Sequence, residues 1–296
     1  MQNAKRAKRR FAFTVIELLV CIGIVCVLTA MLFPAIAAAR SSARKSYCSI
    51  RLRELALATT VYESANKRIP PNLTSVYNQW QFHLLPHLEH QSIYSGIVSE
   101  VDIYPQSAYA WMTIPSFLCP ENADSEFPMR QYVTYFLVGK SDYVGIVGTT
   151  SELSDGVFPA YGKGVGGVKS KGVKYSDVLD GLSNTLLFGE RPPSKEGTVG
   201  SWLRGLTHMN ATVAVFDQGP FPIGQGTEPM MGCGEQKFQL GDLSNPCSAS
   251  HNWSLHAGGA HFAMVDGAVS FFSYSVEERV LRALATRSGG ETDSDR

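Results

Sequence analysis

The first 95 residues contain one glycine, Gly23, whereas the other 26 glycines of the chain lie between residues 96 and 296. No acidic residue precedes Glu17, and from Leu18 to Ala39 there is no charged residue at all. Because glycine serves turns and loops, its scarcity places the loop-rich part of the chain after residue 95. The 22 uncharged residues are enough to cross a bilayer as a helix, which takes about 20 residues.

The chain also lacks the short motifs of common catalytic and metal sites. There is no His-Glu-x-x-His, no nucleophile elbow, no phosphate loop and no Cys/His spacing typical of zinc. The residues that could form a catalytic dyad or a metal site are His256, His261, Asp266, Asp180 and Glu190. A structural interpretation is simpler, because Asp266 can serve a turn and His256 can hold a loop onto it. We therefore expect no enzyme activity, no metal and no cofactor.

Charge is unevenly distributed although the formal net charge is zero. Five of the 26 Lys and Arg residues lie in the first ten positions. Without residues 1–12, 21 basic and 26 acidic residues give a net charge of about −5. We therefore expect no nucleic-acid surface. Basic residues ahead of an apolar segment predict that the N-terminus stays in the cytoplasm and that the remainder is exported.

Three interpretations of the N-terminal segment are open. It can be a cleaved secretion signal, since "AIAAAR" offers small residues near Arg40. It can be a plain signal anchor with Glu17 close to the interface. Neither explains why a carboxylate stands inside an apolar segment, where charges are costly and usually functional.

The stretch "FAFTVIELLVCIGIVCVLTAMLFP" resembles the N-terminal signature of type IV pilins and type II secretion pseudopilins. In that family a basic leader and a small residue precede Phe-Thr-aliphatic-Ile-Glu-Leu-Leu. The resemblance implies cleavage between Ala12 and Phe13 by a prepilin peptidase, followed by N-methylation of Phe13. Counted from Phe13, Glu17 is fifth and Pro34 is twenty-second, the family's positions for an acid and a helix-kinking proline. Ala12 departs from the glycine usual before the cut.

The resemblance gives Glu17 a role in assembly. Its carboxylate would pair with the α-amino group of a neighbouring subunit, which is favourable in a medium of low dielectric. Such a head-to-tail contact, if it does not close, generates a filament. The partners implied are a prepilin peptidase, an inner-membrane assembly platform and other pilin-like subunits. The implied location is the inner membrane, crossed once, with a periplasmic or extracellular C-terminal head.

The helix is expected to continue beyond the membrane. Apolar and small polar residues recur at steps of four and three, and "IPPN" at 69–72 ends the pattern. This stripe is formed by Cys48, Leu52, Leu55, Thr59 and Tyr62. The expected organisation is a leader 1–12, a transmembrane helix 13–39, an amphipathic continuation 40–68, a β-rich head 69–287 and a disordered tail 288–296. The fold class is α+β and pilin-like, with the long helix packed on an antiparallel head with long loops.

The clearest local signal in the head is "AHFAMVDGAVSFFS". Asp266-Gly267 predicts a two-residue hairpin turn with positive φ at both residues. Pairing outward from this turn would place four apolar residues on one buried face. They are Phe262, Met264, Val269 and Phe271.

Export also predicts disulfides, which persist outside the cytoplasm. Cys233 and Cys247 are close in sequence and bracket a loop, and Cys48 and Cys119 are the remaining exported pair. Cys21 and Cys26 lie in the apolar segment and are expected to be ordinary apolar residues.

A second resemblance covers nearly the whole chain. "LHAGGAHFAMVDGAVSFFS" places His256 nine residues before Asp266-Gly267, and "PSFLCPEN", "SDYVGIVGTT" and "DVLDGLSNTLLFGER" precede it in order. This set is similar to a large prepilin-like family, abundant in planctomycetes, whose globular domain is of unknown function. The expected function is a pilin-like structural subunit. The alternatives are a permanently anchored module that binds a glycan or peptide and, less favoured, an anchored hydrolase.

Overall fold

In a computed structural model of the chain, two compact units are separated at residue 43, Met1–Ala43 and Arg44–Arg296. The residues described are 14–75, 78–99, 109, 111–123, 129–130, 137–150, 153–159, 171–193, 200, 202, 212–213, 233 and 236–290. The expected leader, with Ala12 and Phe13, lies outside them.

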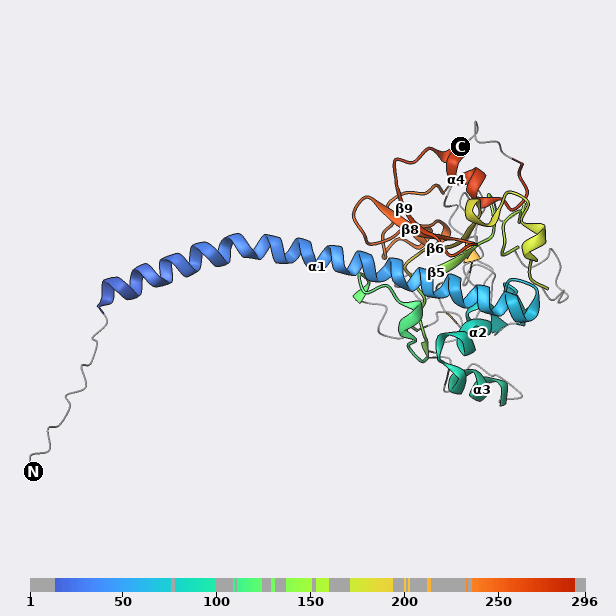
Figure 1. Cartoon of the computed structure of the whole chain (residues 1–296), viewed down its shortest axis with the longest axis horizontal. Coiled ribbons are helices and arrows are strands. Elements are labelled where there is room, and N and C mark those ends of the chain that lie inside the picture. Colours follow the sequence, from blue (N-terminus) through green and yellow to red (C-terminus); the bar gives the residue numbers. More distant parts are fainter. Residues whose placement is uncertain are drawn as a thin grey trace, which may run out of the picture. The chain divides into compact units, whose positions relative to one another are not determined.

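Helix α1 runs from Val15 to Asn66 (Figure 1). Its residues up to Ser42 are exposed and predominantly apolar, and the helix passes through Pro34 without interruption. Cys21 and Cys26 are exposed there as free thiols. Within the described part of the chain, α1 alone is long and apolar enough to cross a membrane.

The second part of α1 carries the stripe expected from the sequence. Cys48, Leu52, Leu55 and Thr59 are buried, and Tyr62 packs half-buried against the same core. The helix ends at Asn66, four residues before Pro70. The helical periodicity therefore predicted the buried face and the end of α1.

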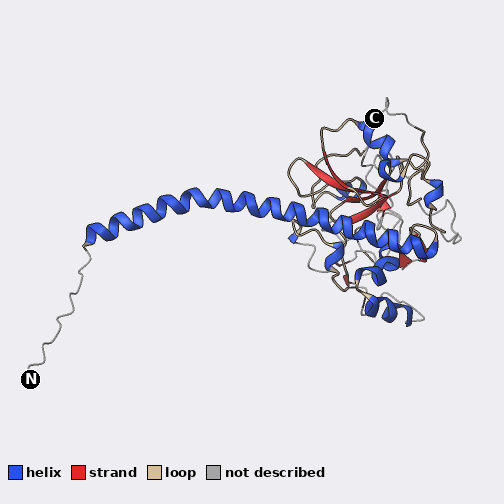
Figure 2. Cartoon of the chain, viewed as in Figure 1, coloured by secondary structure: helices blue, strands red, loops and turns tan. Residues whose placement is uncertain are grey.

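The other elements belong to the unit Arg44–Arg296, and Figure 2 colours them by type. The helices are α2 Trp80–Leu84, α3 Gln91–Ser99 and α4 Glu278–Ala285. Short 3₁₀ turns are η1 Leu85–Leu88, η2 Pro115–Phe117, η4 Tyr175–Asp177, η5 Leu182–Asn184 and η7 Pro246–Ser250. The strands are β1 Leu73–Ser75, β2 Asn78–Gln79, β3 Met129–Arg130, β4 Leu137–Val138, β5 Tyr143–Ile146, β6 Leu186–Glu190, β7 Thr212–Val213, β8 Gly259–Met264 and β9 Val269–Ser273.

Five strands form the central sheet in the order β7-β5-β6-β8-β9. The pairs β5–β6, β6–β8 and β8–β9 are antiparallel, whereas the short β7 runs parallel to β5. A long helix with a mainly antiparallel sheet is the expected α+β fold, and β7 is a departure from a purely antiparallel head.

Helices cover both faces of this sheet. One core cluster joins the buried stripe of α1 to side chains of β6 and β8, among them Phe188 and Ala263. A second cluster joins Leu281 and Leu284 of α4 to Phe262 of β8. Every residue of β6 and β8 is buried. These central strands are therefore apolar on both faces instead of alternating.

The hairpin β8–β9 forms where Asp266-Gly267 predicted it, but its register is different. Ala263 pairs with Val269 and His261 with Phe271, and the Met264 N–H donates to the Ala268 carbonyl at 2.8 Å. The loop therefore has three residues. Within this loop, Gly267 alone has a positive φ, 91°, as in a hairpin with a glycine bulge.

The predicted shared face of this hairpin is therefore wrong. Phe262 and Met264 belong to the cluster on the α4 side, whereas Val269 packs on the α1 side. A one-residue shift of register exchanges the two faces of a strand. His261 consequently lies on the same face as Ala263, toward α1.

Candidate functional site

Glu190 ends strand β6 and is almost completely buried, with 1% of its surface exposed. It pairs with Tyr143 of β5, whose hydroxyl donates to the Cys48 carbonyl of α1 at 3.3 Å. Directly paired residues share a face of the sheet. Glu190 therefore points to the α1 side of the sheet, as His261 does.

Two histidines contact the Glu190 carboxylate. The His261 backbone N–H donates to Oε2 at 2.7 Å, and its ring Nδ1 lies 3.2 Å from the same oxygen. His256, in the loop before β8, places Nε2 3.4 Å from Oε1. The two imidazoles meet edge to face, with ring centroids 5.4 Å apart. We call Glu190, His256 and His261 the acid–histidine cluster.

A disulfide lies against this cluster. Cys48 of α1 is bonded to Cys119 in the loop after η2, with Cα atoms 5.0 Å apart. The sulfur of Cys119 lies 3.5 Å from His256 Nε2. Cys48 is fully buried and Cys119 is 6% exposed. The bond joins segments 71 residues apart and brings sulfur, imidazole and carboxylate to one point.

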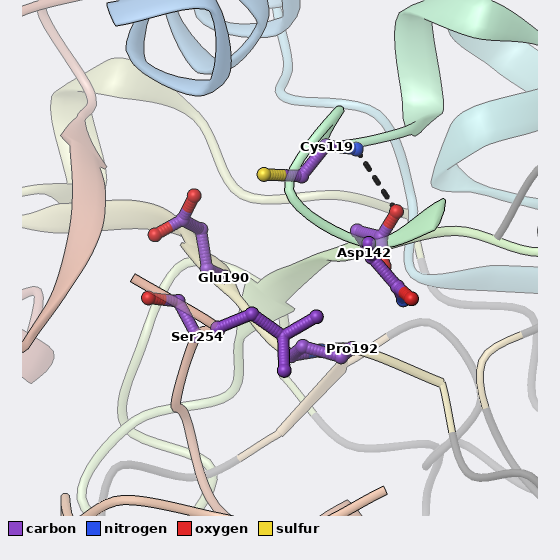
Figure 3. A pocket seen from close by; sticks show the side chains of 7 residues that line it. Cys119, Asp142, Glu190, Pro192 and Ser254 are labelled. Atoms are coloured by element: carbon purple, nitrogen blue, oxygen red, sulfur yellow. Dashed lines mark hydrogen bonds between the residues drawn. The ribbon is translucent and has the colours of Figure 1, made fainter. Parts of the chain in front are cut away.

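Asp142, just before β5, holds the Cys119 loop in place. Its Oδ2 accepts from the Cys119 N–H at 2.9 Å, and its Oδ1 accepts from Asn122 Nδ2 at 2.7 Å. Figure 3 shows the first of these bonds, and the sulfur of Cys119 pointing toward the Glu190 carboxylate. Neither Asp142 nor Asn122 was a candidate from sequence, although the segments "SDYVGIVGTT" and "PSFLCPEN" contain them.

A small hollow opens beside the disulfide and the carboxylate. Its accessible lining is almost entirely apolar, and two of its lining residues, Cys119 and Glu190, belong to the disulfide and to the acid–histidine cluster (Figure 3). The other lining residues are Asn122, Asp142, Pro192, Ser254 and Leu255. The hollow is small and has room for about one water molecule.

Burial and the two neighbouring histidines shift the pKa of Glu190 in opposite directions. Removal from water raises the pKa of a carboxyl group, but the hydrogen bonds and charges of His256 and His261 outweigh it and hold the pKa of Glu190 below its usual value. The carboxylate is thus ionised inside the protein, which requires such partners.

The neighbouring Arg191 is a second buried charge. Burial lowers its pKa to about 9, and its Nη1 donates to the Ala249 carbonyl at 3.1 Å. The guanidinium is still positively charged at neutral pH. Sequence reasoning missed this residue, although "GER" at the end of an apolar run was the available signal.

The remaining sequence candidates lie elsewhere. Asp266 accepts from the Ala268 N–H at 2.9 Å inside the hairpin loop. Asp180 accepts from Thr286 Oγ1 and from the Gly289 and Gly290 N–H groups. Asp266 therefore serves a turn, as its structural interpretation expected, whereas Asp180 holds the segment that follows α4.

Both expected disulfides are present. Cys233 is bonded to Cys247, with Cα atoms 5.5 Å apart, in addition to Cys48–Cys119. Glu17 and Pro34 lie in α1 within the other compact unit.

Two kinds of chemistry are available to the acid–histidine cluster and its disulfide. While the disulfide is formed, these residues have a structural role, because they connect α1, the loop after η2, β6 and β8. In the reduced state the two cysteines would add thiolates to an imidazole and a carboxylate. Sequence spacing did not indicate this combination, because the five residues come from four distant segments.

The comparison with known proteins finds a match to a family whose function is unknown. No curated protein and no solved structure matches the chain. The family described as "Protein of unknown function (DUF1559)" matches residues 37–279, most of the chain. The chain belongs to the DUF1559 family.

Proposed function

We propose that this chain is a pilin-like or pseudopilin-like structural subunit. The observation that carries the proposal is the division of α1. From Val15 to Ala39 its surface is exposed and mostly apolar, and from Cys48 to Thr59 one stripe of the same helix is buried in the core of the head. A single helix that serves first a membrane and then a head is the arrangement implied by the prepilin resemblance.

The proposed partners act in sequence. A prepilin peptidase cuts between Ala12 and Phe13 and methylates Phe13. An inner-membrane platform then assembles the mature subunit with other pilin-like subunits into a type IV pilus or a type II secretion-like filament. The N-terminus starts in the cytoplasm, and the head, beginning near Arg44, lies on the periplasmic or extracellular side.

Mass spectrometry of the protein extracted from membranes tests this function. The expected N-terminal peptide begins FTVIE and carries an N-methyl group. Ala12→Gly should preserve or improve cleavage, and Ala12→Leu should block it, because the family requires a small residue before the cut. A mature start near Arg40, or an intact leader on the wild-type protein, would contradict the proposal.

A second candidate, which the sequence leaves open, is a permanently anchored binding module. The hollow beside Glu190 has room for about one water molecule, so a glycan or a peptide would bind elsewhere on the head. Under this alternative the protein keeps its leader and binds a ligand specifically. Saturable binding of a glycan or a peptide by uncleaved protein would favour the second candidate over the first.

A further inference from the structure

Four potential metal ligands converge beside the hollow. They are Cys48 and Cys119, whose sulfurs form the disulfide, with Glu190 and His256. One ligand atom from each lies within 4.8 Å of every other, and all four residues are buried. In a tetrahedral zinc site, bond lengths of about 2.0–2.3 Å place the ligand atoms roughly 3.3–3.8 Å apart. The group reaches the size of a zinc coordination shell once the two sulfurs, which are bonded to each other in this structure, have separated.

The chemistry of the four groups is selective. Two thiolates, one imidazole and one carboxylate are ligands that favour zinc over calcium or magnesium, which prefer oxygen alone. The two sulfurs are the decisive ligands, and they are available only when the Cys48–Cys119 bond is reduced.

The carboxylate is oriented for such a role. Glu190 Oε2 is held by the His261 N–H at 2.7 Å and by the His261 ring at 3.2 Å. Glu190 Oε1 accepts no well-formed hydrogen bond from any described residue. His256 Nε2 lies 3.4 Å from it. A buried carboxylate oxygen without a donor normally has an explanation, and here Oε1 is left available to a cation that enters once the Cys48–Cys119 bond is reduced.

The surroundings complete the site. His261 fixes the orientation of Glu190, and Asp142 holds the Cys119 loop through its backbone N–H. Metal ligands are usually oriented by such neighbouring groups. The hollow lined by Cys119 and Glu190 lies beside two of the four ligands and has room for about one water-sized group.

We propose that the Cys48–Cys119 position has two states, a disulfide and a zinc site made of Cys48, Cys119, His256 and Glu190. A dithiol reductant supplies two electrons and two protons, which break the S–S bond and leave two thiols. A zinc ion then binds both sulfurs and displaces their two protons to solvent. In either state α1 stays linked to the η2 loop, by a covalent bond or by the metal. This inference is independent of filament assembly.

Cobalt binding tests the proposal, because tetrahedral cobalt with thiolate ligands gives a visible spectrum and a sulfur-to-metal charge-transfer band. The full-length protein in detergent carries Cys21→Ser, Cys26→Ser, Cys233→Ser and Cys247→Ser, so that Cys48 and Cys119 are its only thiols. After reduction with a phosphine, we expect one cobalt ion per chain, displaced by zinc. The oxidised protein should give no charge-transfer band.

Substitutions identify the other ligands. His256→Ala and Glu190→Gln should each weaken cobalt binding by at least tenfold, and His261→Ala, which acts through Glu190, by roughly 10-fold to 100-fold. The control is His251→Ala, which removes a histidine that is equally buried but outside the set. It should leave the affinity unchanged.

Each possible result either supports or overturns the proposed zinc site. If the reduced protein unfolds and zinc restores its circular dichroism spectrum, the proposal is supported, because metal binding then drives folding. Failure of zinc to restore the spectrum would overturn it. A folded, reduced protein that gives no charge-transfer band, or unchanged binding by His256→Ala, would overturn it too.

Discussion

Thr14 and Glu17 cap the start of α1 reciprocally. The Thr14 N–H and hydroxyl both donate to Glu17 Oε2 at 2.9 Å, and the Glu17 N–H donates to Thr14 Oγ1 at 3.3 Å. This is a capping box, which satisfies backbone donors that a helix otherwise leaves free at its N-terminus. Glu17 therefore has a local structural role in addition to the intersubunit pairing that we propose.

Glu17→Gln distinguishes these two roles. Glutamine can replace glutamate in a capping box, but it has no charge to pair with an α-amino group. We expect Glu17→Gln to insert into the membrane and to be cleaved, yet to impair assembly as severely as Glu17→Ala. Crosslinking between subunits in intact membranes measures assembly.

Thr14→Ala is the matched control for Glu17. It removes the hydroxyl of the cap, at a cost of about 1 kcal/mol to the helix, and keeps the charge. It should therefore assemble better than Glu17→Gln. Normal crosslinking by Glu17→Gln, with loss in Thr14→Ala, would mean that capping is the main role of Glu17.

Gly267→Val should destabilise the head strongly. Gly267 has φ 91°, which costs a residue with a Cβ atom about 1–2 kcal/mol and a β-branched residue more. We expect a loss of about 2 kcal/mol or more, which for a unit of this size lowers the melting temperature by roughly 4–8 °C.

Gly267→Asn separates backbone strain from side-chain size. Asparagine tolerates positive φ, and the nearest atom to a new Cβ is Leu57 Cδ2 at 3.9 Å, so the loss should be below about 1 kcal/mol. Equal destabilisation by Val and Asn, measured by thermal unfolding of the full-length protein, would argue against a conformational cause.

Local patterns predicted the local structure. The stripe from Cys48 to Tyr62 follows from helical periodicity, and Asp-Gly located the hairpin loop. Asp-Gly is compatible with both a two-residue turn and a three-residue loop with a glycine bulge. The sequence alone could not choose between them, and this choice decides which residues of β9 share a face of the sheet with those of β8.

The candidate site could be predicted only as a set of residues. Glu190, His256 and His261 were named from residue type. The Cys48–Cys119 bond was expected because these two cysteines remained as a pair among the four exported ones. Their meeting depends on β6 lying beside β8 instead of β7. Strand order is a long-range property that no local pattern in this chain encodes. Asp142 was missed for the same reason, since its partners Cys119 and Asn122 precede it by some 20 residues.

The two disulfides should differ in their contribution to stability. Cys48–Cys119 closes a loop with a sequence separation of 71, and Cys233–Cys247 one of 14. In the chain-entropy account, these stabilise by about 4 and 3 kcal/mol respectively. We therefore expect paired Cys→Ser replacement at 48 and 119 to cost about 1–1.5 kcal/mol more than replacement at 233 and 247.

Denaturation of both double variants in the absence of reductant and metal measures that difference. Non-reducing peptide mapping of the wild-type protein provides the check on pairing. Free thiols at all four positions in exported protein, or a larger loss at 233 and 247, would count against the assigned roles.

Acid should destabilise the head through His251 and His83. Burial lowers the pKa of each to about 4, from an ordinary value of 6.5. Between pH 6.5 and about 4, each of these histidines binds a proton in the unfolded chain but stays neutral in the folded protein. The free energy of unfolding should therefore fall as the pH drops from 6.5 to about 4, by up to roughly 3 kcal/mol for each histidine.

His251→Gln removes one of these titrating groups, so it should flatten the dependence of stability on pH between 6.5 and 4, whatever its effect at neutral pH. Asn252→Ala, a change at the adjacent buried residue that does not titrate, should lower the whole curve without changing its slope. Urea unfolding of the full-length protein at a series of pH values provides both curves. The slope is the informative quantity, because it reports the difference in bound protons between the two states and not the packing lost in either variant. If His251→Gln keeps the wild-type slope over this range, His251 is protonated in the folded protein and its burial does not cause the acid sensitivity.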